Sequence, residues 1–380
     1  MQIFLRARRA ALTFLLSLTL LFSLGATTHA QTQPAKPAVA QPASVAATPW
    51  LFVGFKRDSK DGVYYALSPD GYRWHLVNGG KPVVRPTEPA ELMRDPFIQR
   101  APDGGFRMVW TWSWYSPHVI GYSESHDLLT WSPHRQLAVM DNEPTAVNVW
   151  APALYFEPDQ KRWQIFWSST IPGRSPGDDS GDIANLPGAA APIGLNHRIY
   201  STTTADFQSF TPAKLFFDPG YSVIDATLLP PTTSGGRFVL IYKDERKVPV
   251  LQKHLLTATG PTIEGPWTNL SQPISETWSE GAAIIPVRAT AESPAGFLAY
   301  YDHYSHGQHY GAVFSPDLTH WTDALSRIRF PAEMRHGSFV AITQAEYDRL
   351  EALARMPDAA PATSPITAPV AKPVAAQEAK

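Results

Sequence analysis

The alternation of apolar and polar positions predicts short β-strands through most of the chain. Runs rich in aromatic and branched residues follow turn signals, a pattern typical of strands. A helical pattern comes after the last of them, where residues 343–346 form a capping box and Tyr347, Leu350 and Leu353 share an apolar face. The chain is therefore expected to be all-β with a short C-terminal helix. Four of the predicted strands occupy residues 106–112, 163–168, 238–242 and 296–301.

A short motif recurs after these strands. It combines a hydroxyl residue, an aspartate two residues later and an aromatic residue four positions further on. The hydroxyl and the carboxylate satisfy turn amides, so these aspartates are predicted to be structural. The aromatics lie 57, 79, 57 and 54 residues apart, intervals that fit one four-stranded propeller blade each. Five copies predict a five-bladed β-propeller: residues 68–74, 125–131, 204–210, a degenerate 264–267, and 315–321.

A second series of segments, mostly beginning with a charged or polar residue and then turning apolar, predicts the innermost strands. The last segment has no motif after it, and the first motif has no innermost strand before it. Strands between residues 50 and 74 are therefore expected to join the last blade and close the ring, which avoids an open sheet edge. The segments are 95–98, 151–155, 225–229, 280–285 and 336–340.

The two ends of the chain are predicted to lie outside the propeller. Residues 1–30 contain three arginines, an apolar run and a small-residue cleavage site, typical of a secretory signal peptide. An uncleaved membrane anchor is the alternative, since the run approaches spanning length. Residues 31–48 and 357–380 are rich in Ala and Pro and are expected to be a disordered linker and tail. This leaves residues 49–356 as the propeller domain of a secreted or periplasmic protein with no membrane contact after cleavage.

Composition narrows the range of functions. The 32 basic and 34 acidic residues give a net charge of −2, without the basic field that nucleic acids require. The absence of cysteine excludes disulfides, thiolate metal sites and a cysteine nucleophile. The 12 Trp, 14 Tyr and 18 Phe favour an aromatic-lined site.

Charged residues begin four of the predicted innermost strands, at Asp95, Asp225, Glu280 and His336. Equivalent positions on these strands converge at one end of the channel. Three carboxylates without a visible nucleophile motif suit hydrolysis of a glycosidic bond, in which one acid protonates the leaving oxygen and another activates water. A third carboxylate is expected to raise the pKa of the acid by like-charge repulsion. A solvated pore rim or a buried ion network is the structural alternative.

Seven motifs between Trp50 and Phe339 together resemble glycoside hydrolase family 43, five-bladed propellers that act on arabinose-, xylose- or galactose-containing glycans. The resemblance implies that Asp95 is the general base, Asp225 the pKa modulator and Glu280 the general acid. It also implies that His336 helps to hold a central cation, commonly Ca²⁺ coordinated through waters, and no organic cofactor is expected. Ala153 and Ala282 depart from the family pattern and leave the substrate preference open. The motifs are residues 94–96, 148–152, 196–200, 224–227, 242–245, 279–281 and 335–337.

Further residues are candidates for the rim of the site. Arg94 and Arg335 flank proposed catalytic residues and are predicted to bind sugar hydroxyls or to form structural ion pairs. Trp114 and Trp150, near strand ends, are predicted to stack on sugar rings, whereas Trp110 and Trp112 are expected in the core. The Gly- and Pro-rich residues 171–195 are predicted to form an insertion at the rim that caps one side of the pocket, or a surface loop without that role. The three histidines 303, 306 and 309 are interpreted as loop or substrate-rim residues rather than a zinc site.

Together these features predict an inverting glycosidase that removes terminal sugars from an oligosaccharide or polysaccharide. The leading activity is α-L-arabinofuranosidase, followed by β-xylosidase or galactofuranosidase. Inversion requires about 6.5 to 9.5 Å between the Asp95 and Glu280 carboxyl groups. The alternatives are a non-catalytic glycan-binding propeller and a retaining fructan hydrolase, whose expected Asn-Asp-Pro segment the sequence lacks. The oligomeric state stays open.

Overall fold

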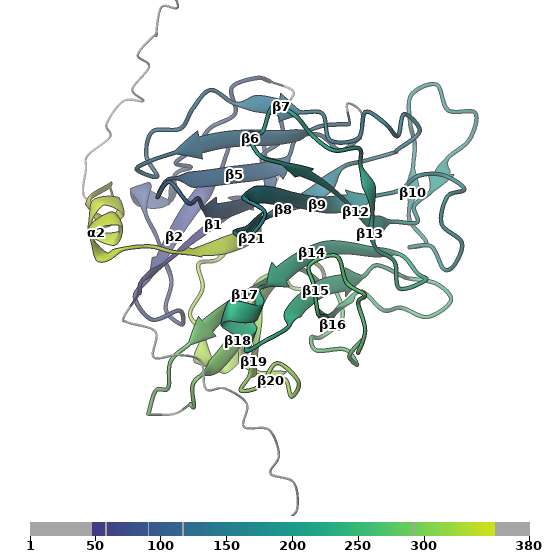
Figure 1. Cartoon of the computed structure of the whole chain (residues 1–380). Coiled ribbons are helices and arrows are strands. Elements are labelled where there is room, and N and C mark those ends of the chain that lie inside the picture. The colour runs from purple at the N-terminus through teal and green to yellow at the C-terminus, as the bar shows by residue number, and fades with distance from the viewer. Residues whose placement is uncertain (1–47, 58, 90, 116–117, 292, 354–380) are drawn as a thin grey trace, which may run out of the picture. The chain divides into compact units, whose positions relative to one another are not determined.

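The computed structural model describes residues 48–353, apart from residues 58, 90, 116–117 and 292. Five antiparallel sheets form the five predicted blades (Figure 1). Helix is limited to α1 (Pro231–Ser234), α2 (Gln344–Leu353) and two 3-10 turns, η1 (Asn78–Gly80) and η2 (Leu325–Arg327), among the described residues. The expected all-β, five-bladed β-propeller is thus confirmed. The predicted signal peptide, nearly all of the linker and the C-terminal tail lie outside the described residues.

Each blade begins at an innermost strand and is built outward by neighbouring antiparallel strands. One blade runs β4 (Arg94–Arg100), β5 (Phe106–Thr111), β6 (Ile120–Ser125) and β7 (Arg135–Leu137). The next runs β8 (Trp150–Glu157), β9 (Arg162–Ser169), β12 (Arg198–Thr204) and β13 (Lys214–Phe217). The third has three strands, β14 (Val223–Leu229), β15 (Phe238–Asp244) and β16 (His254–Gly260). The fourth runs β17 (Ser279–Val287), β18 (Gly296–His303), β19 (His309–Ser315) and β20 (Thr322–Asp323).

The fifth blade joins the two ends of the propeller. β21 (Met334–Ala341) pairs with β1 (Trp50–Lys56), and β2 (Tyr64–Ser68) and β3 (His75–Leu76) complete the sheet. The innermost strand of each blade contacts that of the next around the ring, including β21 with β4 (Figure 1). Ser338 links these last two, because its hydroxyl donates to the Pro96 carbonyl and accepts the Ile98 N–H. The predicted ring closure is confirmed.

The recurring motif forms the predicted turns. Ser125 Oγ accepts the N–H groups of Asp127 and Leu128 at 3.2 and 2.9 Å, and Asp127 Oδ1 accepts those of Leu129 and Thr130 at 2.8 and 2.7 Å. The copies beginning at Ser68 and Thr204 repeat this pattern. The degenerate copy accompanies the three-stranded blade, whose outer position is reduced to a bridge between Thr259 and Thr268.

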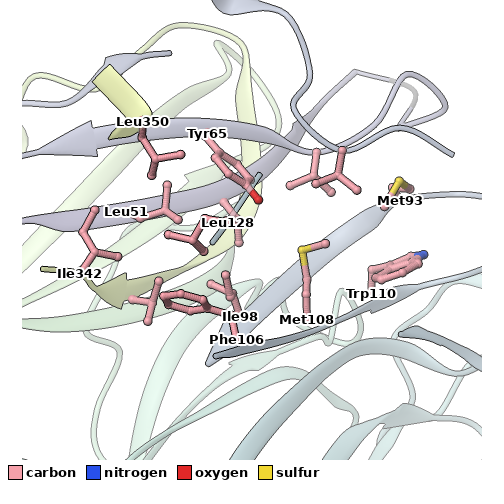
Figure 2. Packing of buried hydrophobic residues seen from close by; sticks show 14 of the residues in the cluster. Leu51, Tyr65, Met93, Ile98, Phe106, Met108, Trp110, Leu128, Ile342 and Leu350 are labelled. Carbon is pink, nitrogen blue, oxygen red and sulfur yellow. The ribbon is translucent and has the colours of Figure 1, made fainter. Parts of the chain in front are cut away.

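The core lies between the blades and extends to the C-terminal helix. Figure 2 shows one cluster, in which side chains from β1, β2, β4 and β5 pack together with Leu350 of α2. Trp110 and Trp112 belong to this cluster, as predicted. The capping box is formed, since the Thr343 N–H donates to Glu346 at 2.7 Å and the Glu346 N–H donates to Thr343 Oγ1 at 3.2 Å.

The predicted insertion lies between β9 and β12 and contains a small hairpin, β10 (Ile183–Ala184) and β11 (Ile193–Gly194). Its buried Ala184 and Leu195 pack with Val147, and Tyr115 and Trp150 lie against the same cluster. The insertion is therefore fixed beside the start of β8. Within the part of the chain that the structure describes, no helix is long and apolar enough to cross a membrane.

Candidate active site

Bulges place the candidate side chains at one end of the innermost strands. In β4, β8, β14 and β17 the register with the second strand shifts at the strand start, so that two residues oppose one. The first bulge residue has a positive φ in each case: 51° at Asp95, 47° at Ala151, 56° at Asp225 and 62° at Gly281. β21 has its own irregularity against β1, at His336.

This register corrects one detail of the sequence interpretation. Asp95 and Asp225 occupy equivalent bulge positions, but the equivalent residue in β17 is Gly281, and Glu280 precedes it. Glu280 is therefore equivalent to Arg94 rather than Asp95. Glycine is required at 281, because a Cβ there would lie 2.3 Å from the His336 ring. The missing side chain makes room for the imidazole.

His336 connects two of the carboxylates. Its Nδ1 lies 3.3 Å from Asp95 Oδ1 and 3.7 Å from Asp225 Oδ2, and all three residues are buried. Thr111 Oγ1 donates to Asp95 Oδ2 at 2.8 Å. The Gly281 N–H donates to Asp225 Oδ2 at 3.0 Å, which places Asp225 beside the backbone of the Glu280 strand. The structure thus brings the predicted carboxylates and histidine together.

Glu280 is held by two cations. Lys243 Nζ lies 3.0 Å from Glu280 Oε2, and Arg335 Nη2 lies 3.4 Å from Oε1. Arg335 also pairs with the buried Asp302. Arg335 therefore forms the ion pairs that were one of its two predicted roles.

The charges divide the acids into different protonation states. Burial disfavours the Asp95 charge, but Arg94 and His336 outweigh it and lower the pKa of Asp95 to about 2. Burial, reinforced by Glu280, raises the pKa of Asp225 to about 6 although His336 opposes it. Burial also disfavours the charge on His336, but Asp225 and Asp95 raise its pKa to about 9. At neutral pH, Asp95 is a carboxylate and His336 an imidazolium.

Glu280 differs from its sequence-based expectation. Burial favours its neutral form, yet Lys243 and Arg335 outweigh burial and hold its pKa below the ordinary value. Like-charge repulsion within the pair instead raises the pKa of Asp225. The expectation that Asp225 keeps Glu280 protonated is therefore wrong for the free protein, because two cations contact Glu280 directly. Of the three candidate carboxyls, Asp225 is the one whose pKa is raised.

A series of ion pairs extends from Glu280 to the insertion. Lys243 Nζ lies 2.8 Å from Glu245 Oε2, Glu245 also pairs with Lys253, and Lys253 Nζ lies 3.0 Å from Asp182 Oδ2. Lys243 and Lys253 are buried. A continuous series of ion pairs therefore joins the insertion to Glu280, the residue predicted to be the general acid.

Aromatic side chains lie on the Asp95 side of the site. Trp114 is 48% exposed, and the Arg94 guanidinium lies 4.4 Å from its ring centroid. Arg94 Nε is 3.9 Å from Asp95 Oδ1. The Trp150 ring meets Trp114 edge to face, and its Nε1 donates to the Trp114 carbonyl at 2.5 Å. Both tryptophans lie near the carboxylates, and Trp114 presents a large exposed aromatic surface.

Most of the chain matches a family of known proteins. Residues 46–348 match the glycoside hydrolase family 43-related family, described as "Probable glycosyl hydrolase domain". The chain belongs to this family. An α-L-arabinofuranosidase of Bifidobacterium longum is 24% identical over 220 residues, covering 52% of this chain and 20% of that protein. The chain thus spans about a fifth of the length of this relative.

Solved structures show similarity at low sequence identity. An α-L-arabinofuranosidase from Lactobacillus brevis is 15% identical with a TM-score of 0.43, covering 61% of this chain and 72% of that one. An exo-β-1,3-galactanase from Clostridium thermocellum is 14% identical with a TM-score of 0.49, covering 78% and 64%.

The glycoside hydrolase family 43 resemblance raised the question of calcium at His336. The donor set does not fit a directly bound calcium ion, because Asp95 and Asp225 hold His336 as an imidazolium, which has no lone pair for a metal. Across residues 48–353 with their gaps, no group of three or more His, Asp or Glu side chains is arranged to hold a metal ion. The His336 imidazolium carries a positive charge beside both carboxylates.

The three histidines 303, 306 and 309 lie at the end of the β18–β19 hairpin. His303 and His309 face each other across β18 and β19 with their rings 4.6 Å apart, and both lie near Glu276. His306 is exposed beside Trp278. His306 lies in the loop as interpreted, whereas His303 and His309 are the facing end residues of β18 and β19 and His303 is buried.

Sequence reasoning did not assign four residues that complete the site. Thr111, Lys243 and Asp302 each oppose the residue before a bulge, and all three contact a candidate residue. Their shared place at the end of the second strand was the available signal. The fourth, His197, is buried against Trp150 with both ring nitrogens unpartnered among the described residues, and burial with Lys253 lowers its pKa to about 3. His197 belongs to the family-like motif at 196–200, but nothing in the sequence indicated a role other than that of a core histidine.

Proposed function

We propose that this protein is a secreted glycosidase that removes terminal sugars from glycans with inversion, by general acid and base catalysis. The observation that carries the proposal is the joining of Asp95 and Asp225 by His336 directly beside Glu280. Family membership supports hydrolysis of glycosides in general.

Asp95 is suited to be the base. Its lowered pKa keeps it ionised across most of the pH range, and Thr111 and His336 fix the orientation of its carboxylate. A positioned carboxylate can accept a proton from the attacking water. Its weak basicity is offset by its fixed position.

The acid function belongs to Glu280 together with Asp225. The Glu280 side chain is 14% exposed, whereas Asp225 is buried and holds a proton up to about pH 6. The charge on Glu280 raises the pKa of Asp225, and Asp225 contacts the backbone of the Glu280 strand, so the proton that Asp225 holds is proposed to pass to Glu280 as a leaving oxygen approaches. The reaction is therefore expected to run best in mildly acidic solution.

The sugar is proposed to be α-L-arabinofuranose, with β-xylose or galactofuranose next. The Bifidobacterium longum relative is named an α-L-arabinofuranosidase, and the exposed face of Trp114 suits stacking on a sugar ring. A glycan-binding propeller without catalysis remains the alternative, and it predicts binding without turnover.

The test compares wild type and Asp95→Asn on aryl arabinofuranoside, aryl xyloside and aryl galactofuranoside. Loss of a positioned base is expected to lower turnover by about 10² to 10⁴. Circular dichroism and the melting temperature show whether the variant is folded. Near-wild-type turnover by a folded Asp95→Asn protein contradicts the role of Asp95, and glycan binding without any turnover by wild type favours the binding propeller.

A further inference from the structure

A pocket of about 830 Å³ opens beside Trp114, next to the candidate active site. This volume lies within the range of small-ligand sites, roughly 300 to 1,000 Å³. The segments that line it come from five places in the chain: the segment after β1, the segment before β4, the segment between β5 and β6, the segment before β8, and the insertion. Its lining includes Lys60, Trp114, Tyr115, His118, Val147 and Leu186.

We propose that this pocket binds a second sugar unit, attached to the sugar that lies over the carboxylates and on the side opposite the leaving group. The inference deepens the proposed function and rests on it. It means that the enzyme recognises a terminal disaccharide, or a terminal sugar that carries a sugar branch, and not a single ring alone.

The pocket is linked to the candidate carboxylates through Arg94. Trp114 lines the pocket and also contacts Arg94, whose Nε is 3.9 Å from Asp95. Only one side chain therefore separates the indole from the proposed base. A ring bonded to the sugar over Asp95 would reach the exposed Trp114 surface directly.

The walls are held in place by packing. Leu186 of the insertion lies against the cluster of Val147, Ala184 and Leu195, together with Tyr115. The insertion is also anchored by the ion pair of Asp182 with the buried Lys253. A wall that is packed and charge-paired costs little ordering entropy when a ligand binds, which favours a preformed site.

The proposed roles of Asp95 and Glu280 indicate which part of the glycan binds in the pocket. In an inverting reaction, water attacks from the base side and the leaving group departs on the acid side. Trp114 adjoins Arg94 and Asp95, whereas Glu280 adjoins Lys243, which lies under the Tyr304 ring at 4.3 Å. The leaving group therefore belongs near Tyr304, and the pocket at Trp114 receives the part of the glycan that stays.

The lining suits a sugar. Trp114 and Tyr115 offer aromatic surface for the apolar face of a ring, and His118 and Lys60 offer polar nitrogens for hydroxyls. The Ser113 hydroxyl donates to the Tyr115 carbonyl, and its oxygen can accept a hydrogen bond from a sugar hydroxyl. Among the described residues that line the pocket, none is a carboxylate.

The test uses two substrates with the same aryl leaving group, the monosaccharide glycoside and the corresponding disaccharide glycoside. Their identical leaving groups make the same demand on the acid. We expect kcat/KM to be at least about tenfold higher for the disaccharide, which corresponds to about 1.4 kcal/mol. Equal values for the two substrates would overturn the proposal.

Two variants test whether the preference for the disaccharide glycoside arises from binding in this pocket. Thr145 is exposed and lines the pocket, so Thr145→Trp fills it without entering the core. The ratio of kcat/KM for the two substrates should fall to about one. The matched control is Gln160→Trp, at an exposed position in the turn between β8 and β9, which should keep the wild-type ratio. A preference that persists in folded Thr145→Trp places the second sugar elsewhere and contradicts the proposal.

A binding measurement separates this proposal from the proposed function. Titration calorimetry of the Asp95→Asn protein with the free disaccharide and monosaccharide needs no turnover. Tighter disaccharide binding that Thr145→Trp removes supports the pocket even if no glycoside is hydrolysed, in which case only the catalytic proposal fails. Equal affinity for both sugars overturns the pocket while leaving the catalytic proposal intact.

Discussion

At the scale of single residues, the site is governed by which cation contacts which carboxylate. The sequence was sufficient to select Asp95, Asp225 and Glu280, because acids at strand starts of a propeller converge. It was not sufficient to assign their protonation states. The protonation state of Glu280 depends on its ion pair with Lys243, which lies in the neighbouring blade. A contact between two blades leaves no pattern in the local sequence.

Replacing Lys243 tests this charge balance. Lys243→Met removes a buried cation that stabilises the ionised form of Glu280, so the pKa of Glu280 should rise. Because the acid must be protonated, the alkaline limb of the pH dependence of kcat/KM should move to higher pH by about one unit or more.

The matched control for this substitution is Lys214→Met, at an exposed lysine paired with Glu264 on an outer strand. It should leave the pH profile unchanged. An unchanged alkaline limb in folded Lys243→Met would show that Lys243 does not control the proton on the acid.

At the scale of elements, the recurring turn and the bulge show what a sequence pattern can and cannot predict. The turn was predictable because its hydrogen bonds are local, joining residues two and three positions apart. The bulge was not, because the register between β17 and β18 depends on both strands. This explains why Glu280 was aligned one position away from its place in the structure.

The turn aspartates provide a structural test. Asp127→Ala removes the acceptor of two backbone N–H groups, at Leu129 and Thr130. Loss of such a turn or cap acceptor typically costs about 0.5 to 2 kcal/mol in the free energy of unfolding. Denaturant unfolding should show this loss, while kcat/KM on the aryl substrate stays at the wild-type value. A large fall in kcat/KM with unchanged stability would reassign Asp127 to function.

At the scale of the whole propeller, closure was predictable and the central charge was not. The unmatched motif at 68–74 and the unmatched strand at His336 could only be reconciled by joining the chain ends, as β1 and β21 do. The ring brings His336 between carboxylates of β4 and β14, and Glu280 of β17 adds to its field. His336 is far in sequence from both Asp95 and Asp225, so no local sequence pattern indicates this environment.

This central imidazolium predicts how stability depends on pH. The pKa of His336 is raised from 6.5 to about 9 in the folded protein, so its stabilising contribution is complete below about pH 6.5 and is lost as the pH rises through about 9. The pKa of Asp95 is lowered to about 2, so its contribution is present above about pH 4 and is lost as the pH falls through about 2. The melting temperature should therefore fall between pH 7 and pH 9.5.

Substitution of His336 tests whether this residue causes the fall in melting temperature at alkaline pH. His336→Gln should melt lower than wild type at pH 7 and lose most of the further decrease toward pH 9.5. His126→Gln, at an exposed histidine, should behave as wild type. Identical alkaline slopes for wild type and a folded His336→Gln protein would assign the transition to another group.

The stereochemical outcome follows from how the ring separates the acids. Asp95 lies on β4 and Glu280 lies on β17. Between these two innermost strands the ring contains β21, which carries His336 and contacts both. His336 contacts Asp95, and Arg335 contacts Glu280, so side chains of β21 occupy the space between the two carboxylates. This arrangement favours the separation of about 6.5 to 9.5 Å that admits a water molecule, over the roughly 5 to 5.5 Å that a nucleophile requires. We therefore expect inversion at the anomeric carbon. Proton NMR of a fresh digest, recorded before mutarotation, detects the first product, and a product that retains the configuration of the substrate would instead require Asp95 to act as a nucleophile.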